Sequence, residues 1–297
     1  MTPREKGFLL LTSQLGDPNR DPLTVAQLRD LTVRVRSAEA SNSHRQIAPS
    51  DLVELGYSSA MAQRIVRLLS QEDQLECYLQ KGRRAGCAAL TRVSPGYPAA
   101  VRKRLGIDSP GCLWAKGDAA LLEQPCVSLV GSRELCEKNT AFARRAGMEA
   151  ARQGYVLASG NARGADRTAQ DACLENGGKV IVVVADALEK HRPREGVLYL
   201  SEDSYDTPFS SHRALSRNRV IHSLGSITLV AQSDLYTGGT WDGTTRNLRA
   251  GWSSVFCFHD GTEASRQLEE MGAVSIDMEA LKDLPSLMNT SWNFFTR

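Results

Sequence analysis

The stretch that decides the fold reads CVSLVGSRELCEKNTAFARRAGMEAARQGYVLASGNARGAD and spans residues 126–166. It holds two short apolar runs, 126–130 and 155–159, each followed by a polar loop that contains glycine and arginine. Residues 138–153, between them, have the apolar spacing of an amphipathic helix. This order predicts adjacent parallel strands with both loops at their carboxyl ends, the edge where open parallel sheets bind ligands. Backbone N–H groups, helix N-termini and guanidinium groups bind phosphate, so we expect a phosphate-binding Rossmann-like core.

The strand–helix alternation continues outward from this stretch. Near-continuous apolar runs such as KVIVVVA (179–185) are typical of a parallel sheet covered by helices on both faces. We predict strands at 126–130, 155–159, 179–185, 196–201, 226–232 and 254–258, and helices at 138–153, 166–177, 213–224, 243–250 and 262–271. The predicted fold class is α/β, an extended Rossmann-like parallel sheet with a small N-terminal helical domain.

Three segments follow from this pattern. Residues 1–85 are predicted to form a helical, SAM-like domain, 86–275 the extended Rossmann-like domain, and 276–297 a C-terminal tail. Within the first segment, apolar spacing predicts helices at 24–35, 49–69 and 72–86, with the polar residues 37–46 as a loop. A strand at 87–93, a short helix ending at 105 and a strand at 112–115 precede the core.

Composition restricts the function classes. The net charge of +2 over 297 residues is too small for binding through bulk charge, so a nucleic acid would need local basic patches. No apolar run approaches a membrane span and no signal-peptide pattern opens the chain. The seven cysteines include no C-x-x-C pair, and those in predicted strands, such as Cys126 and Cys257, are expected to be buried free thiols. We expect a cytoplasmic protein without metal, cofactor or membrane contact.

Two loops at the strand ends supply the first candidate phosphate ligands. The loop after 126–130 offers Gly131, Ser132 and Arg133, and the loop after 155–159 offers Gly160, Arg163 and Gly164. The alternative is an ordinary connection with an exposed arginine. No G-x-G-x-x-G fingerprint is present and no acidic residue ends the second strand, which argues against a dinucleotide-dependent oxidoreductase. Asp166 is expected to cap the helix that follows.

The helix predicted at 213–224 carries the densest basic patch, with Arg213, Arg217 and Arg219. Arg213 and Arg217 lie one helical turn apart, so we expect both on one stripe facing a phosphate backbone. The alternative is a solvated helix face.

A glycine-rich loop at Gly238–Thr245 is predicted to open the next helix. Gly239 and Thr240 are candidate phosphate contacts, and Trp241 offers a stacking face for a base, with a buried structural tryptophan as the alternative. No nucleophile–base–acid set stands out. The candidate catalytic carboxylates, all near strand ends, are Asp166, Glu202 and Asp242.

These motifs, in this order, resemble the DNA-processing protein A (DprA/Smf) family. The resemblance covers roughly residues 50–275 and is carried by VGSR (130–133), SGNARGAD (159–166), SED (201–203) and SRNRVIHSLG (216–225). It implies an extended Rossmann fold behind a small helical domain, single-stranded DNA binding, self-association as a homodimer and loading of a RecA-type recombinase. The anion-binding positions that it implies are Gly131, Ser132, Arg133, Arg163, Gly164, Arg217 and Arg219.

Three departures set this chain apart from the family pattern. The stretch after the third core strand shrinks to ADALEKHRPREG (185–196), and GGTWDGTTRNLRA (238–250) replaces the family's G-S-x-I-T-A segment. After Gly272 the sequence does not show the family's carboxy-terminal winged-helix domain. We therefore expect a divergent member.

Three function hypotheses follow. The first is a non-enzymatic protein that binds single-stranded DNA during DNA uptake, recombination or processing. The second is a nucleotide-binding or base-processing enzyme that cleaves N-glycosidic bonds in nucleotides or modified bases in DNA. A structural or sensor role, for instance in phage defence, is the third.

Overall fold

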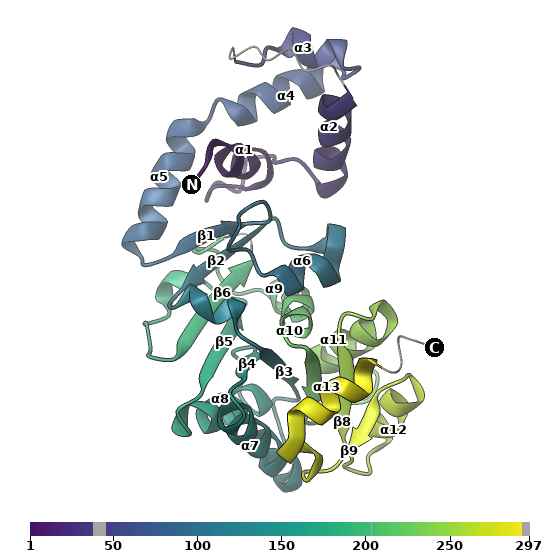
Figure 1. Cartoon of the computed structure of the whole chain (residues 1–297). Coiled ribbons are helices and arrows are strands. Elements are labelled where there is room, and N and C mark those ends of the chain that lie inside the picture. The colour runs from purple at the N-terminus through teal and green to yellow at the C-terminus, as the bar shows by residue number, and fades with distance from the viewer. Residues whose placement is uncertain (38–45, 203, 293–297) are drawn as a thin grey trace.

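The computed structural model describes residues 1–37, 46–202 and 204–292. All but the ends of the polar segment at 37–46, and the last residues of the predicted tail, lie outside these ranges. A sheet of nine strands forms the centre of the described chain, in the order β1-β2-β6-β5-β4-β3-β7-β8-β9 (Figure 1). The strands are β1 (Ala88–Thr91), β2 (Cys112–Lys116), β3 (Cys126–Val130), β4 (Val156–Ser159), β5 (Lys179–Val184), β6 (Val197–Glu202), β7 (Ile227–Val230), β8 (Ser254–Phe258) and β9 (Val274–Ile276).

The predicted parallel α/β sheet is confirmed. Strands β3 to β9 pair in parallel, and β1 and β2 add an antiparallel edge. The chain leaves β3 for β4 on one side and later places β7 on the other side of β3, so the strand order reverses there. In open α/β sheets this switch point is where the loops diverge and leave a crevice for a ligand.

Helices cover both faces of the sheet, as the apolar strands require. They are α1 (Pro3–Thr12), α2 (Val25–Ser37), α3 (Pro49–Glu54), α4 (Ser59–Leu69), α5 (Glu72–Arg84), α6 (Ala99–Leu105), α7 (Glu137–Arg152), α8 (Ala165–Glu175), α9 (Ser211–Ser216), α10 (Asn218–Leu224), α11 (Gly238–Ala250), α12 (Glu263–Glu270) and α13 (Leu284–Trp292). None of those within the described ranges has the length and apolar content needed to cross a membrane.

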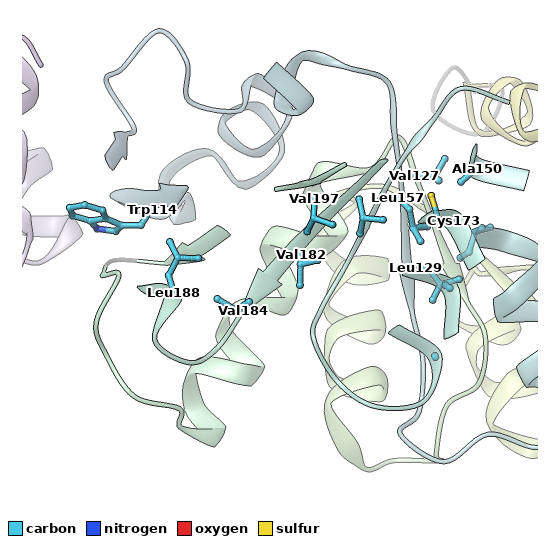
Figure 2. Packing of buried hydrophobic residues seen from close by; sticks show 14 of the residues in the cluster. Trp114, Val127, Leu129, Ala150, Leu157, Cys173, Val182, Val184, Leu188 and Val197 are labelled. Atoms are coloured by element: carbon cyan, nitrogen blue, oxygen red, sulfur yellow. The ribbon is translucent and has the colours of Figure 1, made fainter. Parts of the chain in front are cut away.

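Alternation along each strand sends neighbouring residues to opposite faces. In β3, Val127 and Leu129 join the core cluster that includes α7 and α8, whereas Cys126 and Val130 join the cluster that includes α6 and α10. Figure 2 shows the first cluster extending along the sheet from Trp114 in β2 to Leu157 in β4. The two clusters hold the strand ends, and therefore the loops, in fixed positions.

The N-terminal helices pack on the β1–β2 edge of the sheet through α1 and α5 (Figure 1). The rings of Tyr78 in α5, Trp114 in β2 and Tyr205 pack with their centroids within 5.5 Å of one another, and Trp114 lies edge-on to both tyrosines. Helices α2, α3 and α4 share a separate cluster of buried side chains. The domain boundaries at 85/86 and 275/276 stay predictions.

Three predicted elements were wrong in detail. The helix predicted at 49–69 is two helices, because Gly56 takes a φ of +88° after α3 and a side chain there would meet the Arg34 guanidinium. The helix predicted at 213–224 is divided at Arg217 into α9 and α10, although Arg217 keeps helical dihedral angles (φ −66°, ψ −17°). The predicted loop at 238–245 is helical, since α11 already begins at Gly238, and β9 is a strand that the sequence pattern did not indicate.

A buried polar network joins α10 to α11 and β7. His222 is buried, with Nδ1 3.1 Å from the Asn247 side-chain nitrogen, which also lies 3.0 Å from the Ser253 hydroxyl. Since the amide nitrogen donates, Nδ1 accepts and the imidazole is neutral. Burial, and after it the positive charge of Arg217, lower the pKa of His222 to about 3.

This low pKa predicts that the protein loses stability in mild acid. An unfolded chain protonates His222 near its ordinary value of 6.5, whereas the folded chain resists protonation down to about 3. The stabilisation is therefore complete above pH 6.5 and is lost as the pH falls toward 3. We expect the free energy of unfolding, measured by urea denaturation, to fall by about 2 kcal/mol more between pH 7.5 and 4.5 than in His222→Asn. Asparagine places an acceptor near the position of Nδ1 but does not titrate. An equal fall in the free energy of unfolding in both proteins would show that His222 is not the group responsible for the loss of stability.

Candidate phosphate-binding site

A cavity of about 500 Å³ opens at the switch point of the sheet. Loops from the carboxyl ends of three parallel strands meet there: residues 130–134 after β3, residues 162–166 after β4 and residues 234–240 after β7. Helices α9 and α10 close the remaining side with Leu215 and Arg217. The two loops in the stretch that decides the fold therefore border one cavity, as predicted.

Glycines let these loops approach one another. Gly164 has a φ of +81°, and an added Cβ would lie 2.4 Å from the Arg133 carbonyl oxygen. A Cβ added at Gly131 would lie 2.5 Å from the Ala165 Cβ, and the Ala165 backbone N–H donates to the Ser132 carbonyl at 3.2 Å. Gly164 also holds the N-cap position of α8, so the prediction that Asp166 caps this helix was wrong. Asp166 instead accepts a hydrogen bond from the Ala162 N–H at 3.2 Å.

Arg217 is the central side chain of the cavity. It is 9% exposed, and its guanidinium donates no hydrogen bond to any residue that the structure describes; Nε is fully enclosed. Gly160 makes this placement possible, because a Cβ there would lie 2.2 Å from both terminal guanidinium nitrogens. Burial lowers the pKa of Arg217, opposed by the carboxylates of Asp166 and Glu202. Unused guanidinium donors form strong, charge-assisted hydrogen bonds to anions, which makes Arg217 a candidate anion-binding residue.

Arg133 and Arg163 flank this buried group from the two loops. Both are exposed, and both line the cavity. Arg163 forms an ion pair with Glu134 at 2.9 Å, with both side chains largely in solvent, and such a pair exchanges readily for a phosphate. The cavity thus offers three guanidinium groups at different depths.

The other two predicted arginines are used within the fold. Arg213 donates to the Pro208 carbonyl at 3.2 Å and to the Ser201 hydroxyl at 2.8 Å. Arg219 pairs with the buried carboxylate of Glu202 at 3.3 Å. The Arg217 N–H donates to the Arg213 carbonyl at 3.0 Å, so these two residues lie one helical turn apart. Their side chains nevertheless make different contacts, and neither Arg213 nor Arg219 lines the cavity.

Of the three candidate catalytic carboxylates, one lines the cavity and two form ion pairs elsewhere in the fold. Asp166 lines the cavity and is buried; burial raises its pKa, an effect that Arg217 opposes. Glu202 is committed to Arg219 and the Ser216 hydroxyl. Asp242 lies 3.6 Å from Arg246 one turn along α11, on the surface. Of the three, Asp166 alone lines the cavity.

The residues predicted to form a glycine-rich loop are instead the first turn of α11, and this turn borders the cavity. Gly239 and Thr240 line the cavity, and the Gly239 carbonyl accepts a hydrogen bond from Asn218 at 2.9 Å. Trp241 packs on the core cluster beside α10, with its ring edge-on to Tyr236 at 5.1 Å. This position favours the structural alternative for Trp241.

The structure adds residues that sequence reasoning missed. Phe209, 57% exposed, lines the cavity from the segment before α9, and Asn218 and Asp234 join it. The available signal for Phe209 was an aromatic residue in a short polar segment ahead of the arginine-rich helix. Ser132, which was predicted, lies at the rim with its hydroxyl 3.3 Å from the Gln232 carbonyl.

Fold and site together define an extended Rossmann-like α/β protein with a basic cavity at the switch point of its sheet. The family model for DNA recombination-mediator protein A matches residues 88–242. The chain belongs to this family. The resemblance drawn from its motifs is confirmed.

Relatives support the same assignment. The chain is 32% identical over 142 residues to DNA processing protein DprA of Streptococcus pneumoniae, which covers 44% of this chain and 50% of the relative. It is 28% identical over 185 residues to protein Smf of Escherichia coli, covering 57% and 49%. The chain thus spans about half the length of the curated relatives it matches.

Solved structures share the fold. The crystal structure of the S. pneumoniae protein superposes with a TM-score of 0.71 at 21% identity, covering 96% of this chain and 98% of that one. DNA processing protein A from Helicobacter pylori, studied for its single-stranded DNA binding mode, superposes with a TM-score of 0.57 at 23% identity, covering 70% and 96%.

Proposed function

We propose that this chain binds single-stranded DNA in the cavity at the switch point, as part of DNA uptake, recombination or processing. The observation that carries the proposal is the buried Arg217, which lines the cavity and whose guanidinium has no hydrogen-bond partner among the described residues. Arg133 and Arg163 add two more cations at the rim. Membership of the family and the DNA binding named for the H. pylori relative support the same ligand.

A polymer fits this site better than a single nucleotide. A second cavity of about 380 Å³ shares Arg133, Arg163 and Arg217 with the first and continues past the end of β5. Successive phosphates could therefore contact guanidinium groups along the edge of the sheet. Self-association as a homodimer, delivery of DNA to a RecA-type recombinase and a cytoplasmic location, all implied by the family, belong to the same proposal.

Hydrogen exchange tests where the DNA lies. We expect an oligonucleotide of thymine to slow amide exchange in residues 131–135, 160–165 and 237–241, because bound phosphates would cover these loops. Exchange in α2 and α4, remote from the cavity, serves as the internal control and should not change. Protection confined to the helices before residue 85 would place the DNA elsewhere and contradict the proposal.

A second candidate function rests on Asp166. This buried carboxyl lies in the same cavity, and its raised pKa favours the protonated form, which is the form that can donate a proton to a leaving base. An enzyme that cleaves the N-glycosidic bond of a nucleotide or a modified base would need such a group. Release of free base from nucleotides or DNA that disappears in Asp166→Asn would establish this activity, and binding without turnover would exclude it.

A further inference from the structure

The second cavity has a different chemical character at its far end. Its three lining residues that the first cavity lacks are Asn161, Ala185 and Asp186. They follow the carboxyl ends of β4 and β5. We call this end, defined by Asn161, Ala185 and Asp186, the β5 recess. It places a carboxylate and an amide beside a groove that is otherwise lined by arginines.

The fold holds the Asp186 carboxylate in place. His191 Nε2 lies 2.9 Å from Asp186 Oδ1, and the imidazole ring stacks on Tyr199 in β6 with 5.0 Å between centroids. His191 is mostly buried, whereas Asp186 is 38% exposed toward solvent. One carboxylate oxygen is therefore oriented by a packed imidazole. The side chain is positioned for a ligand instead of moving freely.

A carboxylate at this point does not suit the phosphate backbone. The Asp186 carboxylate repels the negative charge of a phosphodiester, and the repulsion grows as the two groups approach. A favourable contact of this carboxylate must therefore be with another part of the nucleotide, such as the base. A carboxylate accepts hydrogen bonds, and bases in single strands are read along their Watson–Crick edges. Guanine presents two adjacent donors, N1–H and the N2 amino group, which match two carboxylate oxygens. Thymine presents one N–H between two carbonyl oxygens that the carboxylate would repel.

The rest of the groove can hold the same nucleotide. Phe209 lines both cavities and is largely exposed, so it offers an apolar face on which a base can lie. Arg163 and Arg217 also line both, and they would hold the adjoining phosphate. Asn161 adds an amide beside the base. Asp186 and His191 fall in the shortened stretch 185–196, where this chain departs from the family pattern.

We propose that the β5 recess is a nucleobase site in which Asp186 selects guanine over thymine in single-stranded DNA. This inference rests on the proposed function, since it assigns a base preference to the same groove.

The test compares three short thymine oligonucleotides that differ at one central position, which carries dT, dG or deoxyinosine. A single dG can reach the recess because the uniform flanks let the strand shift its register. By fluorescence anisotropy the full chain should bind the dG oligonucleotide about 10-fold more tightly than the dT oligonucleotide. Deoxyinosine, which lacks the N2 amino group, should fall between them. Asp186→Ala should abolish the preference without weakening binding to dT, and Asp171→Ala, which removes an exposed carboxylate from α8, should retain it.

Equal affinities for the three oligonucleotides in the wild-type chain would overturn the inference while leaving DNA binding intact. A preference that survives in Asp186→Ala would overturn it as well. Uniformly tighter binding by Asp186→Ala, without any wild-type preference, would show a carboxylate that only repels phosphate. Absence of binding to every oligonucleotide would instead count against the proposed function itself.

Discussion

Replacing Arg217 with methionine is expected to lower the affinity for single-stranded DNA about 10- to 100-fold. Charge-assisted hydrogen bonds contribute about 1.5–3 kcal/mol each, and this guanidinium has no competing partner among the described residues. Methionine retains the buried aliphatic stem and removes only the charge and the donors. Fluorescence anisotropy with a thymine oligonucleotide measures the loss.

Two further variants distinguish a specific contact of Arg217 with DNA from the effect of the protein's overall charge. Arg217→Lys should lose less affinity than Arg217→Met, because lysine keeps the charge but not the planar fork. Arg249→Met removes one positive charge from the exposed end of α11 and should change the affinity by less than a factor of about 3. If Arg217→Met and Arg249→Met bind alike, Arg217 is not a phosphate ligand.

Gly164→Ala is expected to destabilise the fold by more than about 3 kcal/mol. Two costs add there: a φ of +81° with a ψ of −127°, which residues with a side chain avoid, and a Cβ placed 2.4 Å from the Arg133 carbonyl. Neither backbone can retreat easily, because Ala165 N–H is bonded to Ser132. Urea denaturation measures the change in the free energy of unfolding.

Gly177→Ala is the matched control for that substitution. Gly177 also has a positive φ, +72°, but an added Cβ meets nothing within 4 Å. It should cost only about 1 kcal/mol, the backbone term alone. Similar losses in the two variants would show that the close approach of the β3 and β4 loops contributes nothing to stability.

Much of the fold could be predicted because continuous apolar runs in the sequence mark the strands that are buried in the sheet. The apolar run 179–185 predicts a buried parallel strand, and β5 is one. The antiparallel edge and β9 were harder, since three residues such as Val274–Ile276 carry too little pattern. The glycines of 238–245 suggested a loop, but helical hydrogen bonds and packing against α10 outweigh their low helix propensity.

The site was predictable where local sequence determines position. Arg133 and Arg163 follow strands directly, so the strands place them at the edge. The arginine-rich helix was different, because its spacing places Arg213 and Arg217 one turn apart but does not show that the Arg213 side chain bonds Ser201 and Pro208 instead of lining the cavity. Phe209 comes to the groove only through the arrangement of β6 and α9, which no local pattern describes.

We propose that Arg133, Arg163 and Arg217 hold the phosphates of single-stranded DNA. The most direct test is the salt dependence of the affinity. Neutralisation of about three phosphates predicts a slope of about −2 for the logarithm of the association constant against the logarithm of the salt concentration. In Arg217→Met the slope should become shallower by about 0.7, the share of one contact. A slope near zero, or one that Arg217→Met leaves unchanged, would contradict the account.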